Sequence, residues 1–69
     1  MHDVWRSSAI LQRVMARNPS QPLTEGELMG ASGLSRHEMR AGMDELEATL
    51  EVERRGTGDR KRWQLTQAA

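Results

Sequence analysis

The sequence predicts a small α+β domain of three helices followed by a C-terminal two-stranded β-hairpin. Three observations lead to this fold class. Apolar residues recur with the helical period of 3.6 through most of residues 3–49. Two of the helical segments open with a Thr or Ser followed three residues later by Glu, the spacing of a capping box. After that the apolar period changes to two on either side of a glycine-rich turn, which is typical of a hairpin.

The composition indicates one domain, residues 1–69, and limits its chemistry. A chain of 69 residues buries only a modest core. It has no cysteine, so a disulfide framework and a thiolate zinc site are both excluded. No apolar segment approaches membrane-spanning length and no leader pattern is evident, so we expect a soluble, cytoplasmic protein without membrane partners.

The charges balance overall but are unevenly placed. Ten Lys and Arg residues offset ten Asp and Glu residues, which argues against a strongly basic nucleic-acid binder. Residues 38–53 hold six acidic side chains and one Arg, whereas residues 54–62 hold five basic side chains and one Asp. The neutral average therefore conceals a basic tip beside an acidic body.

The first predicted helix covers residues 3–17. Its apolar arc consists of Val4, Ile10, Leu11, Val14 and Met15, with Trp5 at the edge. Three arginines lie on the opposite side: Arg6, Arg13 and Arg17. They fit a solvated face, and contact with phosphates or a partner protein stays open as the alternative. Pro19 and Pro22 then end the helix.

The second and third predicted helices cover residues 24–32 and 35–49. Thr24 and Glu27 form the capping box of the first of these, and Gly33 is placed to end it in a left-handed conformation. Ser35 and Glu38 form the box of the next helix. Two helices joined by a short Gly-containing turn make a helix-turn-helix unit.

The third helix has an apolar arc of Met39, Met43, Leu46 and Leu50. Gly42 stands inside this helix, where it costs about 1 kcal/mol relative to Ala. Because Gly42 borders the apolar arc, we expect another helix to approach closely there.

The hairpin is predicted over residues 50–66. With residues 56–59 as the loop, Val52 faces Trp63, Leu50 faces Leu65 and Arg55 faces Arg60. The same register pairs Glu53 with Arg62 on the outer face. The five basic residues then gather at the far end of the hairpin.

The order helix, short extended Pro-Leu segment, helix, turn, helix and hairpin resembles a winged helix-turn-helix domain. The likeness extends to the stretches around Leu23–Leu28, Gly33–Arg36, Asp44–Ala48 and Val52–Arg55, which look like the pattern of MarR- and ArsR-like bacterial or phage regulators. It departs at Leu50 and Glu51, where the family has a Gly and an apolar residue. Because Leu is strained in a left-handed conformation, we expect Leu50 to belong to the first hairpin strand.

The resemblance implies sequence-specific binding of duplex DNA by a transcriptional regulator. The third helix would enter the major groove, and the basic hairpin, the wing of the family, would contact the backbone or minor groove. Arg36 and Arg40 suit either guanine edges or phosphates, and the sequence leaves both open. The implied DNA-binding residues are Thr24, Ser35, Arg36, His37, Arg40, Arg54, Arg55, Arg60, Lys61 and Arg62.

Other functions receive less support from the sequence. His2 and His37 have no ligand spacing and no catalytic arrangement is evident, so we expect no enzyme activity, metal, cofactor or small-molecule effector. The alternative is a protein-interaction module that docks through its acidic surface in a larger replication, phage or plasmid complex. The near-zero net charge favours this alternative, whereas the clustered hairpin cations favour DNA. A homodimer through the first helix, with Trp5 at the contact, is also compatible with the sequence.

Overall fold

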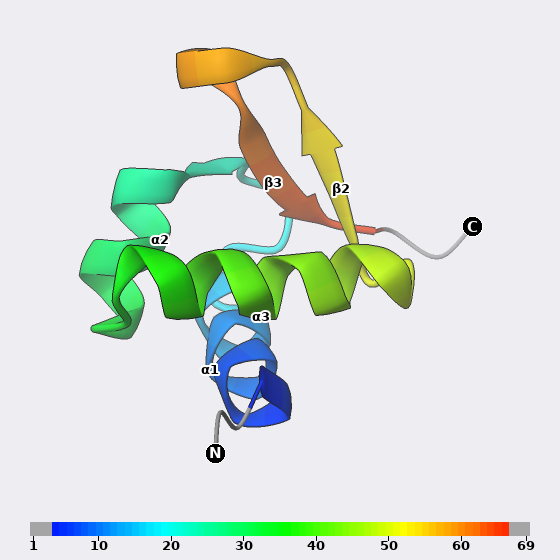
Figure 1. Cartoon of the computed structure of the whole chain (residues 1–69). Coiled ribbons are helices and arrows are strands. Elements are labelled where there is room, and N and C mark those ends of the chain that lie inside the picture. Colours follow the sequence, from blue (N-terminus) through cyan, green and yellow to red (C-terminus); the bar gives the residue numbers. More distant parts are fainter. Residues whose placement is uncertain (1–3, 67–69) are drawn as a thin grey trace.

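The computed structural model describes the backbone of residues 4–66 and the side chains of residues 6–66. It is a small α+β fold with three helices and a three-stranded antiparallel sheet (Figure 1). The helices are α1 (Val4–Ala16), α2 (Glu25–Ser32) and α3 (Arg36–Ala48). The strands are β1 (Leu23–Thr24), β2 (Val52–Arg55) and β3 (Arg62–Leu65), and a 3-10 turn, η1 (Gly58–Arg60), joins the last two. None of the helices within residues 4–66 is long and apolar enough to cross a membrane.

Both predicted capping boxes are present. The Thr24 hydroxyl accepts the Glu27 amide at 3.2 Å, and the Thr24 amide donates to the Glu27 carboxylate at 2.9 Å. Ser35 and Glu38 repeat this reciprocal pair at 3.2 and 3.0 Å. Gly33 ends α2 in the predicted left-handed conformation, with φ of 76°. Local sequence signals therefore fix where α2 and α3 begin and how they are joined.

The core lies between α3, α1, α2 and one face of the sheet. Its buried apolar residues are Leu11, Val14, Met15, Leu28, Met39, Met43, Leu46, Val52 and Trp63. Figure 1 shows α3 running below the hairpin, with α1 seen nearly end-on beneath it. The side chains of Val4 and Trp5 lie outside the described residues, and so does the predicted dimer contact through Trp5.

Gly42 lies where α3 meets α1. A Cβ atom built on Gly42 would stand 3.1 Å from the backbone of Ser7 and Ser8, and 2.7 Å from a methyl group of Leu11. The predicted close approach of another helix at Gly42 is confirmed.

The sheet has one strand more than the predicted hairpin. β3 is its central strand and pairs with both β1 and β2 in the order β1-β3-β2. Leu23 pairs with Trp63 and Thr24 with Arg62, which joins the start of α2 to the hairpin. The two-residue length of β1 leaves no period-two pattern in the sequence, and this explains why the third strand was not predicted.

The predicted hairpin register is wrong by two residues. Val52 pairs with Leu65 and Arg55 with Arg62, because residues 56–61 form the connection rather than residues 56–59. The longer connection contains the η1 turn, in which the Arg60 amide donates to the Thr57 carbonyl at 3.2 Å. Since the shift is an even number of residues, Val52 and Trp63 still face the core as expected.

The predictions for Leu50 are also wrong. Leu50 belongs neither to the core nor to a strand, since its side chain is 78% exposed and its φ is 60°. It follows α3 in a Schellman-type ending, in which the Glu51 amide donates to the Leu46 carbonyl and the Leu50 amide to the Glu47 carbonyl. The chain therefore turns out of α3 through a left-handed Leu, at a position where helices more often have Gly.

We expect Leu50→Gly to raise the free energy of unfolding by about 0.5–1 kcal/mol. The left-handed conformation costs a residue with a Cβ about 1–2 kcal/mol, and part of this gain is offset by the larger entropy of Gly in the unfolded chain. Little apolar burial is lost, because Leu50 is exposed. Thermal unfolding followed by circular dichroism should show a midpoint higher by about 2–8 °C. Leu50→Ala keeps the Cβ and should bring no such increase. A lower midpoint for Leu50→Gly would mean that the Leu50 side chain stabilises the fold.

Candidate functional site

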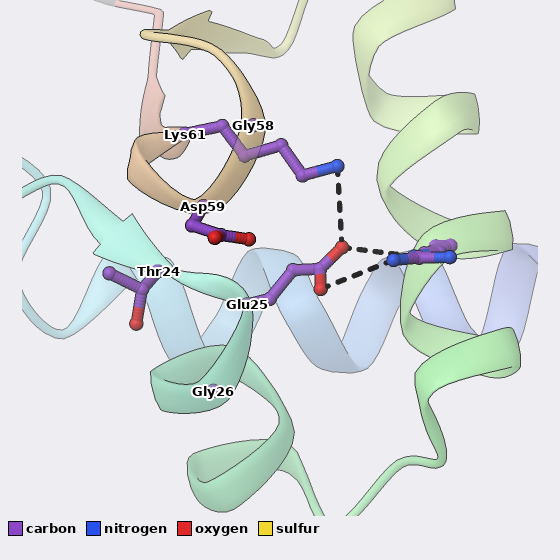
Figure 2. A pocket seen from close by; sticks show the side chains of 7 residues that line it. Thr24, Glu25, Gly26, Gly58, Asp59 and Lys61 are labelled. Atoms are coloured by element: carbon purple, nitrogen blue, oxygen red, sulfur yellow. Dashed lines mark hydrogen bonds and ion pairs between the residues drawn. The ribbon is translucent and has the colours of Figure 1, made fainter.

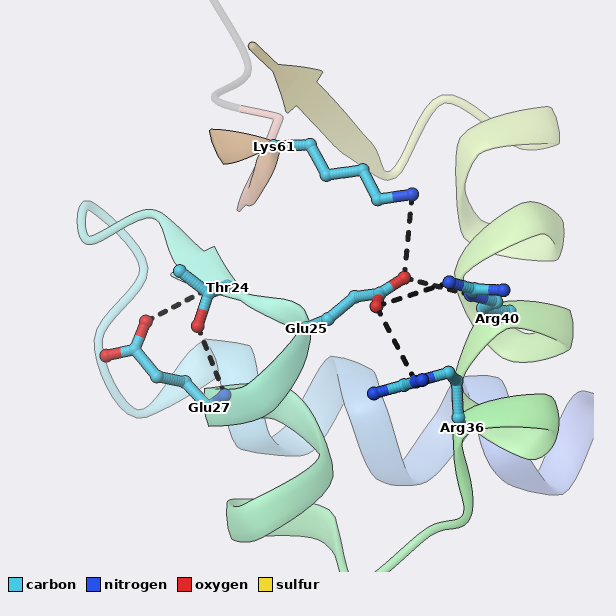
Figure 3. A network of polar contacts seen from close by, with 6 residues as sticks. All are labelled: Thr24, Glu25, Glu27, Arg36, Arg40 and Lys61. Atoms are coloured by element: carbon cyan, nitrogen blue, oxygen red, sulfur yellow. Dashed lines mark hydrogen bonds and ion pairs between the residues drawn. The ribbon is translucent and has the colours of Figure 1, made fainter. Parts of the chain in front are cut away.

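The centre of the candidate site is the carboxylate of Glu25, at the first position of α2. Arg40 donates to it through two nitrogens, Nε at 2.9 Å and Nη2 at 3.4 Å. Lys61 Nζ lies 3.5 Å from the same carboxylate and Arg36 Nε lies 3.9 Å from it. Figure 3 shows the three cations reaching Glu25 from two directions, Arg36 and Arg40 from α3 and Lys61 from the hairpin.

The fold explains why these residues meet. Arg36 and Arg40 are four residues apart, so they share one face of α3. Pairing of Thr24 with Arg62 holds the end of the hairpin connection beside the start of α2, and Lys61 immediately precedes β3. The ammonium group of Lys61 also lies 5.6 Å from the centre of the Trp63 ring, a cation–π distance that steadies the side chain.

A hollow of about 500 Å³ opens beside this cluster (Figure 2). It lies between the start of α2, the middle of α3 and the η1 connection. Its walls are Thr24, Glu25, Gly26, Arg40, Gly58, Asp59 and Lys61. Two cations and two carboxylates line it, so it is a polar surface hollow rather than an apolar ligand pocket. Within residues 4–66, no three His, Asp or Glu side chains gather as metal ligands.

The ion pairs shift the pKa values of the residues that form them. The pKa of Glu25 is lowered chiefly by the hydrogen bond from Arg40, with further attraction from Arg40 and Lys61, while partial burial acts in the opposite direction. The pKa of Arg40 is raised by the same hydrogen bond. The pKa of Glu27 is lowered by its hydrogen bonds with the backbone and side chain of Thr24, and to a lesser degree by Arg62.

These shifts predict a loss of stability in acid. Glu25 and Glu27 have folded pKa values below the ordinary value of 4.5, so their charged forms stabilise the fold above that pH. This contribution disappears as the pH falls through the lowered pKa values. Thermal unfolding can be measured by circular dichroism at a series of pH values. The midpoint temperature should decrease once the pH is lower than about 4.5. Glu25→Gln should show a smaller fall than the wild type, and an equally steep fall would rule out Glu25 as a source of the acid sensitivity.

The structure brings together part of the predicted DNA-binding set. Arg36, Arg40 and Lys61 meet at Glu25, with Thr24 adjoining them along the wall of the hollow. The hydroxyls of Thr24 and Ser35 are occupied as helix caps. His37 lies exposed in the first turn of α3.

The remaining basic residues of the set lie along the hairpin. Arg54 Nε is 3.6 Å from the carboxylate of Glu47, and Arg55 Nη2 is 3.6 Å from that of Glu53. Arg60 and Arg62 are exposed, and neither has a carboxylate within 4.0 Å among residues 4–66. Within the described part of the chain, neither arginine has to break an ion pair within 4.0 Å to meet an outside anion, and Arg62 attracts the Glu27 carboxylate at longer range.

Glu25 is the residue of this cluster that sequence reasoning missed. An acidic residue at the first position of a helix is favoured by the helix dipole, so Glu25 fits a purely local role. Its strongest partner, Arg40, is fifteen residues away in the chain. No local pattern links the two positions, and their contact depends on how α2 packs against α3.

Comparison with known proteins supports the fold alone. No known family profile and no curated protein matches this chain. The crystal structure of the DIP2311 protein from Corynebacterium diphtheriae is similar, with a TM-score of 0.73 at 23% sequence identity. The match covers 96% of this chain and 12% of that protein, so this chain has the length of a small part of its structural neighbour.

Proposed function

We propose that the chain is a winged helix-turn-helix domain that binds duplex DNA sequence-specifically, as part of transcriptional regulation. In this arrangement α3 enters the major groove, and the hairpin of β2 and β3 contacts the backbone or the adjacent minor groove. The element order and the short β1 strand beside the hairpin support the assignment. The turn from α2 into α3 through Gly33 supports the helix-turn-helix unit.

One observation carries the proposal: cations from α3 and from the hairpin converge at one place. Arg36, Arg40 and Lys61 all lie within 4.0 Å of the Glu25 carboxylate. With Asp59 on the adjoining wall of the hollow, the cluster still holds more positive than negative charge. The surplus attracts a phosphate backbone even though the whole chain has no formal net charge. A groove-binding helix and a backbone-binding hairpin need this proximity.

The ion pair leaves Arg40 able to read a base. Glu25 engages the Nε and Nη2 edge of the guanidinium. Within residues 4–66 no acceptor is bonded to Nη1, which keeps its two N–H groups for an outside partner. A guanidinium that is held on one edge can present the other edge to a guanine or to a phosphate in a defined direction.

The test is salt-titrated binding of a labelled mixed-sequence duplex, measured by fluorescence anisotropy. We expect weak generic binding at low salt, with log K falling against log salt at a slope of about −3 to −5, as for three to five phosphate contacts. Size-exclusion chromatography of the same sample would give the oligomeric state. A complete lack of binding at low salt would overturn the proposal.

A protein-interaction module is the second candidate. The second half of α3 is acidic, with Asp44, Glu45 and Glu47, and it leads to the exposed Leu50. In such a contact Leu50 would lie in the apolar centre and the acidic side chains in the polar rim. A chain that binds no duplex but forms a stable complex with a partner from a replication, phage or plasmid system would fit this alternative.

A further inference from the structure

Glu25 links α3 and the hairpin, the two elements that contact DNA in the proposed function. It belongs to α2, whereas its partners Arg36 and Arg40 belong to α3 and Lys61 to the hairpin connection. Its side chain is only 20% exposed, so the cations largely enclose it. Glu27, two residues further on, does not share this position, because its carboxylate bonds the backbone of Thr24.

We propose that Glu25 is a positioning residue that sets the sequence discrimination of DNA binding by holding Arg40 and by competing with phosphates for its cations. This inference rests on the proposed function. Glu25 touches no DNA in this scheme and acts through Arg36, Arg40 and Lys61.

The competition follows from the chemistry of the carboxylate. A carboxylate and a phosphate both offer paired anionic oxygens to the same N–H donors. Lys61 and Arg36, at 3.5 and 3.9 Å from Glu25, therefore have to be shared with or transferred to any phosphate that approaches the cluster. The negative charge of Glu25 also repels that phosphate at short range. Both effects weaken binding to every DNA sequence alike.

The positioning effect favours one sequence over another. A free arginine side chain samples many rotamers, and ordering it on binding costs about 0.5–1.5 kcal/mol. The two hydrogen bonds to Glu25 order Arg40 before DNA arrives and fix the direction of its open Nη1 edge. A base with acceptors in that direction gains a contact at low entropic cost, whereas other bases do not. Glu25 therefore lowers generic affinity and raises the difference between sequences.

The experiment compares the full chain with Glu25→Gln and uses Glu27→Gln as the matched control. Both substitutions remove one negative charge from α2, and Gln at position 27 preserves the capping box. Glu27 attracts Arg62 at long range but holds none of Arg36, Arg40 and Lys61, so its variant controls for the loss of charge. Generic affinity is measured by anisotropy with the mixed-sequence duplex. Sequence discrimination is measured by enrichment from a pool of randomised duplexes. Circular dichroism at the assay temperature verifies that each variant is folded.

For Glu25→Gln we expect generic affinity to rise about three- to tenfold at low salt, while enrichment of preferred sequences weakens. Glu27→Gln should raise generic affinity less and leave enrichment unchanged. If Glu25 had only a structural role, Glu25→Gln would lower both generic affinity and enrichment or would change neither. Either result would overturn the inference. Wild-type binding with no increase in Glu25→Gln would overturn the inference alone. Absence of duplex binding by both proteins would overturn the proposed function as well.

Discussion

Gly42→Ala is expected to lower the free energy of unfolding by about 1–2 kcal/mol, although Ala is the better helix former by about 1 kcal/mol. The new methyl group would stand 3.1 Å from the backbone of α1 at Ser7 and Ser8. It would also stand 2.7 Å from a methyl group of Leu11, whose side chain is fully buried and would have to shift within the core. α1 and α3 would therefore have to move apart, and their separation would loosen the packing of the core.

Gly30→Ala is the matched control for this prediction. Gly30 lies inside α2, is exposed, and has nothing within 4 Å of the position of an added Cβ. The same chemical change should therefore stabilise the protein there by about 0.5–1 kcal/mol through helix propensity alone. Urea unfolding of the two variants would give free energies that change in opposite directions. An unchanged or higher free energy of unfolding for Gly42→Ala would mean that α1 and α3 accommodate the methyl group without loss of core packing.

Local sequence signals were enough to predict most of the fold. The capping boxes at Thr24 and Ser35 and the left-handed Gly33 each depend on atoms within a few residues of one another. Such contacts are defined by residue type and spacing alone, and all three predictions are confirmed. Gly42 was also predictable, because a helical glycine beside an apolar arc has few reasons other than close packing.

Local sequence signals do not determine the register of the hairpin. Its alternation gave the correct inward faces for Val52 and Trp63 but not the register. Two registers that differ by two residues bury the same faces, so the choice depends on the connection. Gly56 and Gly58 both take positive φ angles, and the η1 turn that begins at Gly58 makes the connection longer than the shortest glycine-rich loop. The prediction that Leu50 belongs to the hairpin strand failed for a related reason. A leucine in a strained left-handed conformation is tolerated when the rest of α3 determines how the chain leaves the helix.

The candidate site needed the tertiary structure. Arg36 and Arg40 oppose the dipole at the start of α3, which in the sequence suggests a role outside helix stability. The structure supplies a second reason for them, because Glu25 compensates both charges from a neighbouring helix. Arg40 therefore has a structural role in addition to its proposed role in reading DNA, and a test has to separate the two.

Two substitutions at Arg40 separate these roles. Arg40→Ala removes the charge, the ion pair and the planar donor group together, whereas Arg40→Lys keeps a charge that can remain beside Glu25. If Arg40 reads a base, both variants should lose about 1–3 kcal/mol of discrimination between preferred and generic duplexes, since lysine cannot donate in the same planar way. Arg40→Lys should retain most of the generic affinity. Unchanged enrichment in both variants would mean that α3 does not read bases through Arg40.

The hairpin arginines should behave in the opposite way. Arg60 and Arg62 are exposed and have no carboxylate within 4.0 Å among the described residues, so their removal disturbs no ion pair of the fold there. The double variant Arg60→Ala/Arg62→Ala should weaken binding to all duplexes to a similar degree and reduce the salt slope by about 2, one for each lost phosphate contact. Enrichment from the randomised pool should be preserved, because phosphate contacts carry no direct sequence information. A changed sequence preference with an unchanged salt slope would instead place these arginines at base edges, and the hairpin would then be a reader rather than an electrostatic clamp.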